Sequence, residues 1–222
     1  MAHSLADYRL FWKQFRRHYH TTGAIAPSGR ALGLALARYV QAAEPDHCPR
    51  RVLEVGPGTG AVTTQIVAAL GPDDRLDMVE LNDEFARRLC ERFETEAPFQ
   101  SVAARARVLH QRVEALAGEE PYDLVISGLP LNNFAADQVE QILAVFERLL
   151  RPGGTLSFFQ YIGIRAARAA ASGRAERARL RGVGAALERV LAPHEIRRDC
   201  VWTNLPPAWV HHVRWPSAGQ ST

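Results

Sequence analysis

The sequence predicts an α/β fold in which a mainly parallel sheet carries helices on both faces. Segments typical of strands and helices alternate from residue 51 to residue 161, which is the pattern of consecutive βα units. A glycine-rich turn joins the first of these strands to the next helix. Near the C-terminus two strand-like segments follow each other without a helix between them, which predicts an antiparallel hairpin at the sheet edge.

The individual elements follow from hydrophobic runs and from the residues that end them. Ser28 is well placed to cap a helix that continues to Gln41, because its hydroxyl can accept from the free amides of the first turn. The next helices are expected to end before Gly71-Pro72, Pro98 and Pro152-Gly153-Gly154, since these residues interrupt helical hydrogen bonding. The expected strands are 51–55, 75–81, 107–110, 122–127 and 155–161, and the expected helices are 61–70, 83–96 and 135–150.

The C-terminal part departs from this alternation. Residues 165–186 are rich in Arg, Ala and Gly, a biased composition that predicts a mobile helix or partial disorder. Residues 195–203 and 208–215 predict the two strands of the hairpin, joined by Leu205-Pro206-Pro207.

Length and composition place limits on the class of protein. The 222 residues are enough for one domain with a sizeable core. No run of 18 apolar residues predicts a membrane span, and charged residues interrupt the first apolar stretch, so no signal peptide is expected. Cys48, Cys90 and Cys200 are far apart without metal-ligand spacing, which favours a reducing cytoplasm and predicts no metal site.

The charge distribution is more informative than the net charge of +3. Residues 1–20 carry +3 and residues 164–198 carry +6, so the remainder carries −6. Two basic segments on an acidic body suggest an anionic partner surface, either a membrane or a nucleic acid. A solvated face explains the charge alone equally well.

The first basic segment predicts an amphipathic helix over residues 4–20. Six side chains fall within an arc of about 120° at helical spacing; they are Leu5, Tyr8, Phe11, Trp12, Phe15 and Tyr19. The opposite side carries basic residues, as in helices that lie in a lipid interface. The alternative is a helix that packs its aromatic side on its own domain.

The glycine-rich turn indicates a cofactor site. Its residues, Glu54-Val55-Gly56-Pro57-Gly58-Thr59-Gly60, follow a strand and open a helix, and Glu80 ends the next strand. Glycines allow close approach of the backbone, and an acidic residue 20 positions later can accept from both ribose hydroxyls. The dinucleotide fingerprint reads G-x-G-x-x-G, whereas this segment reads E-x-G-x-G-x-G. The segment resembles motif I of class I S-adenosylmethionine-dependent methyltransferases, whose fold is Rossmann-like.

This resemblance, over about residues 50–160, implies S-adenosyl-L-methionine as the cofactor. The glycine turn would contact its methionine part, Glu80 its ribose, and the loop after the third strand its adenine. Many relatives carry an acidic residue where this chain has Gln111-Arg112, so backbone groups and Val113 are expected to contact adenine. The implied cofactor-binding residues are Thr22, Gly23, Glu54, Gly56, Gly58, Thr59, Gly60, Glu80, Leu81, Arg112, Val113, Ser127 and Gly128.

The loop after the fourth strand is expected to form the substrate side of the site. It reads Ser127-Gly128-Leu129-Pro130-Leu131-Asn132-Asn133-Phe134. Relatives that methylate nucleic-acid bases often have Asn-Leu-Pro-Tyr here, with the aromatic ring stacking on the base. This chain keeps Leu-Pro but has Ser127 and Leu131 at the polar and aromatic positions. An RNA adenine N6-methyltransferase is therefore the alternative, and nucleic acid is not the favoured partner.

Taken together, the motifs resemble bacterial phospholipid N-methyltransferases nearly from end to end. They include Thr22–Ser28, the glycine turn, the loop after the fourth strand and Asn204–Val210. The resemblance implies stepwise methylation of phosphatidylethanolamine toward phosphatidylcholine, a phospholipid substrate, and no metal. Enzymes that methylate the amine of ornithine-containing lipids look similar, so the head group stays open.

The expected reaction needs a neutral amine, because a primary ammonium has a pKa of ~10.4. The candidates to line the amine are Tyr19, Ser127, Asn132 and Tyr161, and a core position is an equal alternative for Tyr161. Arg165 and Arg168 could hold the lipid phosphate through guanidinium forks, or lie on a solvated face. A membrane module with an inactive cofactor fold is the non-enzymatic alternative.

These interpretations give one methyltransferase domain over residues 1–222. Residues 1–20 would form the membrane-surface helix, 50–160 the cofactor-binding core, and 161–222 the substrate-side helix and edge strands. We expect a cytoplasmic protein that binds peripherally to the inner face of the cell membrane, with residues 4–20 on its anionic surface. The sequence does not predict an oligomeric state.

Overall fold

The computed structural model describes residues 28–41, 48–116, 120–163 and 173–216. The expected helix 4–20 lies outside these residues, so its contact with a membrane stays a prediction. Tyr19, Thr22, Gly23, Arg165 and Arg168 also lie outside them. Among the described helices, none is long and apolar enough to cross a membrane.

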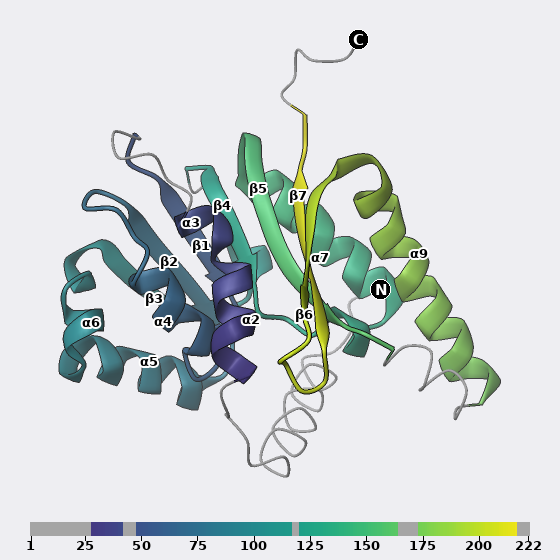
Figure 1. Ribbon diagram of the computed structural model, residues 1–222, viewed down its shortest axis with the longest axis horizontal. Helices are drawn as coiled ribbons and strands as arrows, with labels where there is room; N and C mark the ends of the chain where they lie inside the picture. Colours follow the sequence, from purple (N-terminus) through teal and green to yellow (C-terminus); the bar gives the residue numbers. More distant parts are fainter. Residues whose placement is uncertain (1–27, 42–47, 117–119, 164–172, 217–222) are drawn as a thin grey trace.

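Seven strands form one sheet in the order β3-β2-β1-β4-β5-β7-β6. Five of them pair in parallel, and β7 pairs antiparallel with both β5 and β6. Their bounds are β1 Arg51–Val55, β2 Arg75–Glu80, β3 Ala106–His110, β4 Tyr122–Ser127, β5 Leu150–Tyr161, β6 Glu195–Val201 and β7 Ala208–Arg214. The predicted Rossmann-like sheet with a C-terminal edge hairpin is therefore confirmed (Figure 1).

Helices cover both faces of this sheet. The α-helices are α2 Ser28–Leu36, α3 Arg38–Gln41, α4 Ala61–Val67, α5 Asp83–Thr95, α6 Ala97–Gln100, α7 Ala136–Leu149 and α9 Arg174–His194. Helix α2 packs beside α4 on one face, and α7 packs beside α9 on the other (Figure 1). Three short 3-10 turns complete the described elements: η1 Ala103–Arg105, η2 Val113–Ala115 and η3 Leu131–Asn133.

The hydrophobic core is consequently divided into two layers by the sheet. Leu53, Val125 and Phe158 face α7 and α9, whereas Val52 and Ile126 face α2 and α4. Every residue of β4 is buried, because a central strand covered on both faces has no solvent side. This burial explains why residues 124–126 form a continuous apolar run rather than an alternating pattern.

Several elements differ from those predicted. The helix expected from Ser28 to Gln41 is interrupted by a turn at Ala37, so it forms α2 and α3. Strand β5 begins at Leu150 rather than at 155; its register shifts opposite β4, so that Arg151–Gly154 bulge out of the pairing. The biased segment, expected to be a mobile helix or partly disordered, contains the start of helix α9 from Arg174 onward, and this helix packs Leu180, Val183 and Leu187 into the core.

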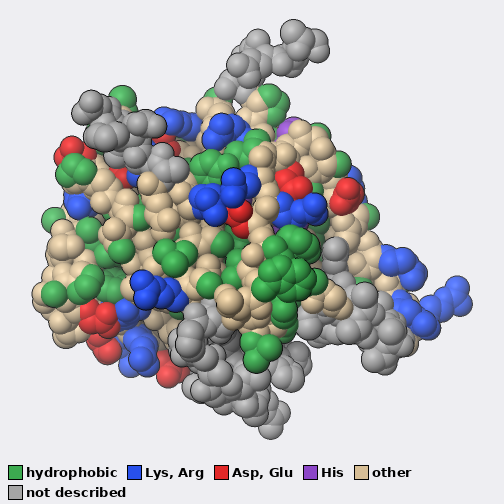
Figure 2. Space-filling view, viewed as in Figure 1, with side chains coloured by type: hydrophobic (Ala, Val, Ile, Leu, Met, Phe, Trp, Pro, Cys, Tyr) green, Lys and Arg blue, Asp and Glu red, His purple; other side chains and the backbone are tan. Residues whose placement is uncertain are grey.

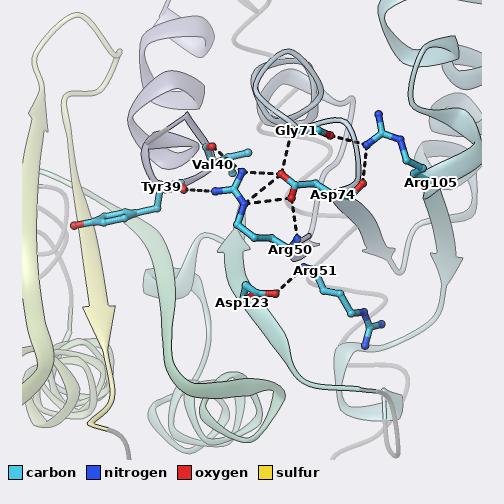
Figure 3. Close-up of polar contacts among 8 residues, drawn as sticks. All are labelled: Tyr39, Val40, Arg50, Arg51, Gly71, Asp74, Arg105 and Asp123. Atoms are coloured by element: carbon cyan, nitrogen blue, oxygen red, sulfur yellow. Dashed lines mark hydrogen bonds and ion pairs between the residues drawn. The ribbon is translucent and has the colours of Figure 1, made fainter. Parts of the chain in front are cut away.

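Buried ion pairs hold the strands together where they begin. The fully buried Asp74 accepts the Arg50 guanidinium at 2.7 Å and the backbone N–H groups of Arg50 and Gly71 (Figure 3). Arg50 also donates to the carbonyl oxygens of Tyr39 and Val40. One carboxylate therefore links α3, the start of β1 and the turn before β2, at the opposite end of the sheet from the glycine turn.

Candidate active site

The glycine turn connects β1 to α4 in a conformation that requires glycine. Gly56, Gly58 and Gly60 have φ angles of 71°, 57° and 84°, in the left-handed region that other residues adopt at a cost. A Cβ atom built on Gly58 would meet no atom within 4 Å. The outer side of the turn is thus open, and a ligand could approach its backbone closely.

A second close approach places the end of β4 against this turn. The Gly128 N–H donates to the Val55 carbonyl oxygen at 2.8 Å. A Cβ atom on Gly128 would lie 2.6 Å from the Gly56 carbonyl oxygen, and one on Gly56 would lie 2.6 Å from Leu129 Cδ2. The turns after β1 and β4 can touch only because neither glycine has a side chain. They meet at the carboxyl ends of the strands, where parallel sheets bind ligands.

Glu80, the last residue of β2, lies beside the same turn. Its buried carboxylate accepts the N–H of Gly58 at 3.0 Å and that of Asn82 at 2.8 Å. Burial raises the pKa of Glu80, although these backbone hydrogen bonds oppose the shift. A carboxylate has about four lone-pair sites, so Glu80 keeps acceptor capacity for a hydroxyl group. Its position suits the predicted ribose contact, which stays a prediction.

Glu54 is the second buried carboxyl group of the site. It is fully buried on β1, and among the described residues neither of its oxygens has a hydrogen-bond partner. Burial raises the pKa of Glu54 to about 8, with nearby Thr63 opposing the shift and Glu80 adding to it. Burying a carboxylate without partners is costly. Glu54 lies beside the open turn, and a positively charged ligand there would favour its ionised form.

Arg92 on α5 holds the turn in place, and it was not among the predicted site residues. Its guanidinium donates to the carbonyl oxygens of Thr59 and Gly60 at 3.1 and 3.0 Å. It also pairs with both oxygens of Glu96 at 2.8 Å and lies over the ring of Phe99, 4.0 Å from its centroid. Arginines recur along this helix at ordinary surface spacing, so no local sequence signal distinguishes Arg92.

Asn82 was also missed, although the sequence contained a signal for it. Its side chain caps α5 by accepting the Phe85 N–H at 3.1 Å, while its own N–H binds Glu80. An Asn followed by two acidic residues is a typical helix start. The cap thus fixes both the beginning of α5 and the orientation of the Glu80 carboxylate.

The residues expected near adenine lie in the neighbouring loops. The Leu81 carbonyl oxygen is 3.1 Å from His110 Nε2. Arg112 pairs with Glu114 at 3.0 Å, and the Val113 side chain is buried in the core on the α7 side. The loop after β3 therefore offers chiefly backbone groups to a ligand.

The substrate-side candidates gather at the carboxyl ends of β4 and β5. Ser127 is buried and its hydroxyl oxygen accepts the Leu129 N–H at 3.3 Å. Asn132 is buried too, and its side-chain oxygen has no partner among the described residues. Tyr161 is half-buried, with its ring edge-on to Phe159. Leu131 belongs to the core, so it offers no exposed surface for base stacking.

Together the fold and the site define an α/β protein that binds a nucleoside-type cofactor at the carboxyl edge of a parallel sheet. In the described part of the chain, no group of three His, Cys, Asp or Glu residues could hold a metal ion. The positive charge of S-adenosylmethionine fits the two buried carboxyl groups, and the open side of Gly58 leaves room for it.

Comparisons with known proteins identify the class more closely. Residues 52–154 match the methyltransferase domain family. The chain is 33% identical over 153 residues to the ornithine lipid N-methyltransferase of Singulisphaera acidiphila, covering 69% of this chain and 77% of that protein. It is also 33% identical over 119 residues to ribosomal RNA small subunit methyltransferase A of a Synechococcus strain, covering 53% of this chain and 40% of that protein.

The fold agrees with these relationships. The crystal structure of the O-methyltransferase from Bacillus cereus in complex with SAH superposes with a TM-score of 0.61 at 13% identity, covering 97% of this chain and 93% of that one. The chain belongs to the class I S-adenosylmethionine-dependent methyltransferases. It is an enzyme of that family, and S-adenosylmethionine is its cofactor.

Proposed function

We propose that the chain methylates the amine of an aminolipid head group at the inner face of the cell membrane. The observation that carries the proposal is the match to the ornithine lipid N-methyltransferase of Singulisphaera acidiphila, which extends over 77% of that protein. The sequence resemblance favours phosphatidylethanolamine, whereas this relative's name supports an ornithine lipid. Both head groups carry a primary amine, so the same chemistry serves either.

The site residues supply binding and orientation for this reaction. When bound, S-adenosylmethionine supplies an electrophilic methyl group on a positively charged sulfur. The glycine turn, Glu54 and Glu80 would hold the cofactor, with the buried carboxyl groups balancing its charge. Holding reacting groups in line contributes a large part of the rate in such transfers.

The acceptor amine must lose a proton before it can react. The buried Asn132 oxygen can accept one N–H of the amine, because the described residues offer it no other donor. An amide oxygen orients the amine but does not take its proton. Removal from water favours the neutral amine, so the ammonium proton would leave to solvent as the head group enters the site.

The burial of Leu131 weighs against a nucleic-acid base as the acceptor. Stacking on aromatic rings is the usual way of holding a splayed base, and Leu131 is packed in the core instead. The ribosomal RNA relative keeps RNA as the alternative, although the chain covers only 40% of that protein.

The test is to incubate the full chain with methyl-labelled cofactor and one acceptor at a time. Vesicles of phosphatidylethanolamine, vesicles of ornithine lipid, vesicles of phosphatidylglycerol and total RNA would be compared. We expect label in at least one of the aminolipids and none in phosphatidylglycerol, which lacks an amine. Label in RNA alone would contradict the proposal.

A matched pair of variants tests the acceptor side of the site. Asn132→Ala should lower turnover on the aminolipid by roughly tenfold or more, because losing one hydrogen bond in the transition state costs about 1–3 kcal/mol. The neighbouring Asn133 is exposed, so Asn133→Ala should have little effect. Equal activities of the two variants would remove Asn132 from the site.

A further inference from the structure

The loop between β6 and β7 presents two large apolar side chains to solvent. Trp202 is 69% exposed and Leu205 is 86% exposed. The other exposed large hydrophobic residues of the described chain, Leu34 and Ile196, reach only 40% and 43%. None of residues 202–207 is charged. An exposed loop is ordinarily polar, so this one is an unusual apolar projection.

Hydrogen bonds hold this loop in its projecting shape. The Asn204 side chain is buried and donates to the Pro206 carbonyl oxygen at 2.7 Å. The Pro207 carbonyl oxygen accepts the Ile162 N–H at 2.8 Å, which ties the loop to the end of β5. Two consecutive prolines restrict the backbone further. The hydrogen-bonded turn therefore holds Trp202 and Leu205 in their exposed positions.

The loop lies at the same edge of the sheet as the candidate active site. Ala208, at the start of β7, pairs with Tyr161 at the end of β5. In Figure 1 the β6–β7 turn and the beginning of α9 reach the same end of the molecule. Helix α9 is tied to this end by Arg179, which donates to the Asn132 carbonyl oxygen at 3.2 Å.

Basic side chains accompany the apolar ones at this edge. Arg174 and Arg177 are exposed on the first turns of α9, and the only acid in its first turn, Glu176, pairs with Arg179 at 2.7 Å. Figure 2 shows hydrophobic side chains gathered over the lower part of the β6–β7 hairpin and basic side chains over the first part of α9. Tryptophan and leucine at the end of the molecule that also carries these arginines match the apolar and anionic layers of a lipid surface.

We propose that the β6–β7 turn inserts Trp202 and Leu205 into the interface of a lipid bilayer, with the start of α9 against its anionic head groups. The orientation would turn the carboxyl edge of the sheet, which carries the candidate site, toward the membrane from which the substrate is drawn. The inference rests on the proposed lipid substrate for its purpose, but the surface itself is independent of catalysis. An RNA partner could stack a base on Trp202 but would leave the apolar side chain of Leu205 without a partner. A second copy of the chain would leave the lipid composition without effect.

The experiment measures sedimentation of the full chain with vesicles that contain no amine substrate. Vesicles of phosphatidylcholine with phosphatidylglycerol would be compared with vesicles of phosphatidylcholine alone. The double variant Trp202→Ser, Leu205→Ser should partition to the anionic vesicles at least about tenfold more weakly than the native chain, because two large side chains lose their apolar contact. Cofactor affinity measured by calorimetry should be unchanged.

The matched control is Ile196→Ser, which removes an exposed apolar side chain from the other end of β6. Seven residues of strand separate that end from the turn, about 20 Å away, so vesicle binding should change less than about twofold. A double variant that binds as well as the control would overturn the inference, as would a turn substitution that alters the oligomeric state without vesicles. If the native chain methylates no aminolipid but binds the anionic vesicles, and the double variant loses this binding, the proposed function is refuted and the membrane surface stands.

Discussion

Gly58 combines a left-handed backbone with an open outer side, so a side chain there would occupy the space of the ligand. Its φ is 57°, and a Cβ atom would meet nothing within 4 Å. We expect Gly58→Val to abolish binding of S-adenosylmethionine in calorimetry while the protein stays folded. Gly163→Val is the control, since Gly163 has the same backbone strain and open surroundings outside the glycine turn. Similar affinity losses in both variants would show that strain, and not occupancy of the site, is responsible.

The buried Glu54 carboxyl group lowers the stability of the cofactor-free protein when it ionises, and it favours binding of a positively charged ligand. Burial raises its pKa to about 8 in the folded chain from 4.5. The free energy of unfolding is therefore highest below pH 4.5, where the group is protonated in both states, and falls as the pH rises toward 8. At pH 7 this loss of folding stability is on the order of 3 kcal/mol. Glu54→Gln should therefore raise the melting temperature of the cofactor-free protein, and raise it more at pH 8 than at pH 5.

The same variant should bind the cofactor more weakly, since Gln cannot balance a positive charge. Thermal unfolding at the two pH values and calorimetry with S-adenosylmethionine measure the two effects. A variant that is destabilised at pH 8 would mean that Glu54 has partners that oppose its burial cost.

Among the individual site residues, the sequence predicted those whose spacing is fixed by backbone geometry. The three glycines and Glu80 stand at the ends of two neighbouring strands, so alternation of strands and helices was sufficient to bring them together. Ser127 and Asn132 were placed by the same reasoning. Arg92 could not be found, because its contacts depend on how α5 packs against the turn, and that packing has no local signature.

Helix α5 positions the glycine turn through one of its side chains, Arg92. Arg92 fastens the carbonyl oxygens of the glycine turn to α5 and to Glu96. Arg92→Met keeps much of the aliphatic contact with Phe99 but removes the donors. We expect cofactor affinity to fall by roughly tenfold or more, because hydrogen bonds to charged groups are worth about 1.5–3 kcal/mol each.

The control on the same helix is Arg87→Met. Arg87 forms an exposed pair with Asp83, and such pairs contribute little, so affinity should stay within about twofold of the native value. Calorimetry decides between them. If Arg92→Met binds the cofactor with the same affinity as Arg87→Met, the glycine turn must be rigid without the hydrogen bonds of Arg92.

Elements were predicted where hydrophobic pattern and end signals agreed. β1 and β4 begin and end at the predicted residues, because a short apolar run between polar residues leaves little freedom. The interruption at Ala37 was not predicted, because no Gly or Pro marks the end of a helix at that position. The early start of β5 was obscured by Pro152-Gly153-Gly154, which form a bulge in the sheet instead of preceding the strand.

In the molecule as a whole, the two ends of the sheet carry different functions. The carboxyl ends hold the glycine turn, Glu80 and the substrate-side loop. The starting ends carry buried ion pairs, and Asp77 illustrates them: burial opposes its ionisation, but hydrogen bonds from Arg107 and Tyr122 outweigh this and lower the pKa of the carboxyl group. The sequence predicted the first end from its motifs. It did not predict the second, because those pairs join residues of separate strands.

Stability and cofactor binding should therefore respond to different substitutions, and Asp74 tests this separation. Its fully buried carboxylate pairs with Arg50 at 2.7 Å and links α3, β1 and the turn before β2. Removing one partner of a buried pair costs about 3–5 kcal/mol, so Asp74→Ala should lower the free energy of unfolding by that amount in urea titrations.

Affinity for S-adenosylmethionine should meanwhile stay within about twofold of the native value at a temperature where the variant is folded. Glu80 lies at the far end of the strand that follows Asp74, about 20 Å away, which is the reason for expecting so little coupling. Asp74→Asn keeps the shape of the side chain with a smaller loss of stability, and it replaces the alanine variant if that variant does not fold.

Asp83→Ala is the exposed control, where loss of the pair with Arg87 should cost no more than about 1 kcal/mol of folding stability. Cofactor affinity that falls in step with stability across these variants would mean that the two ends of the sheet are coupled through β2.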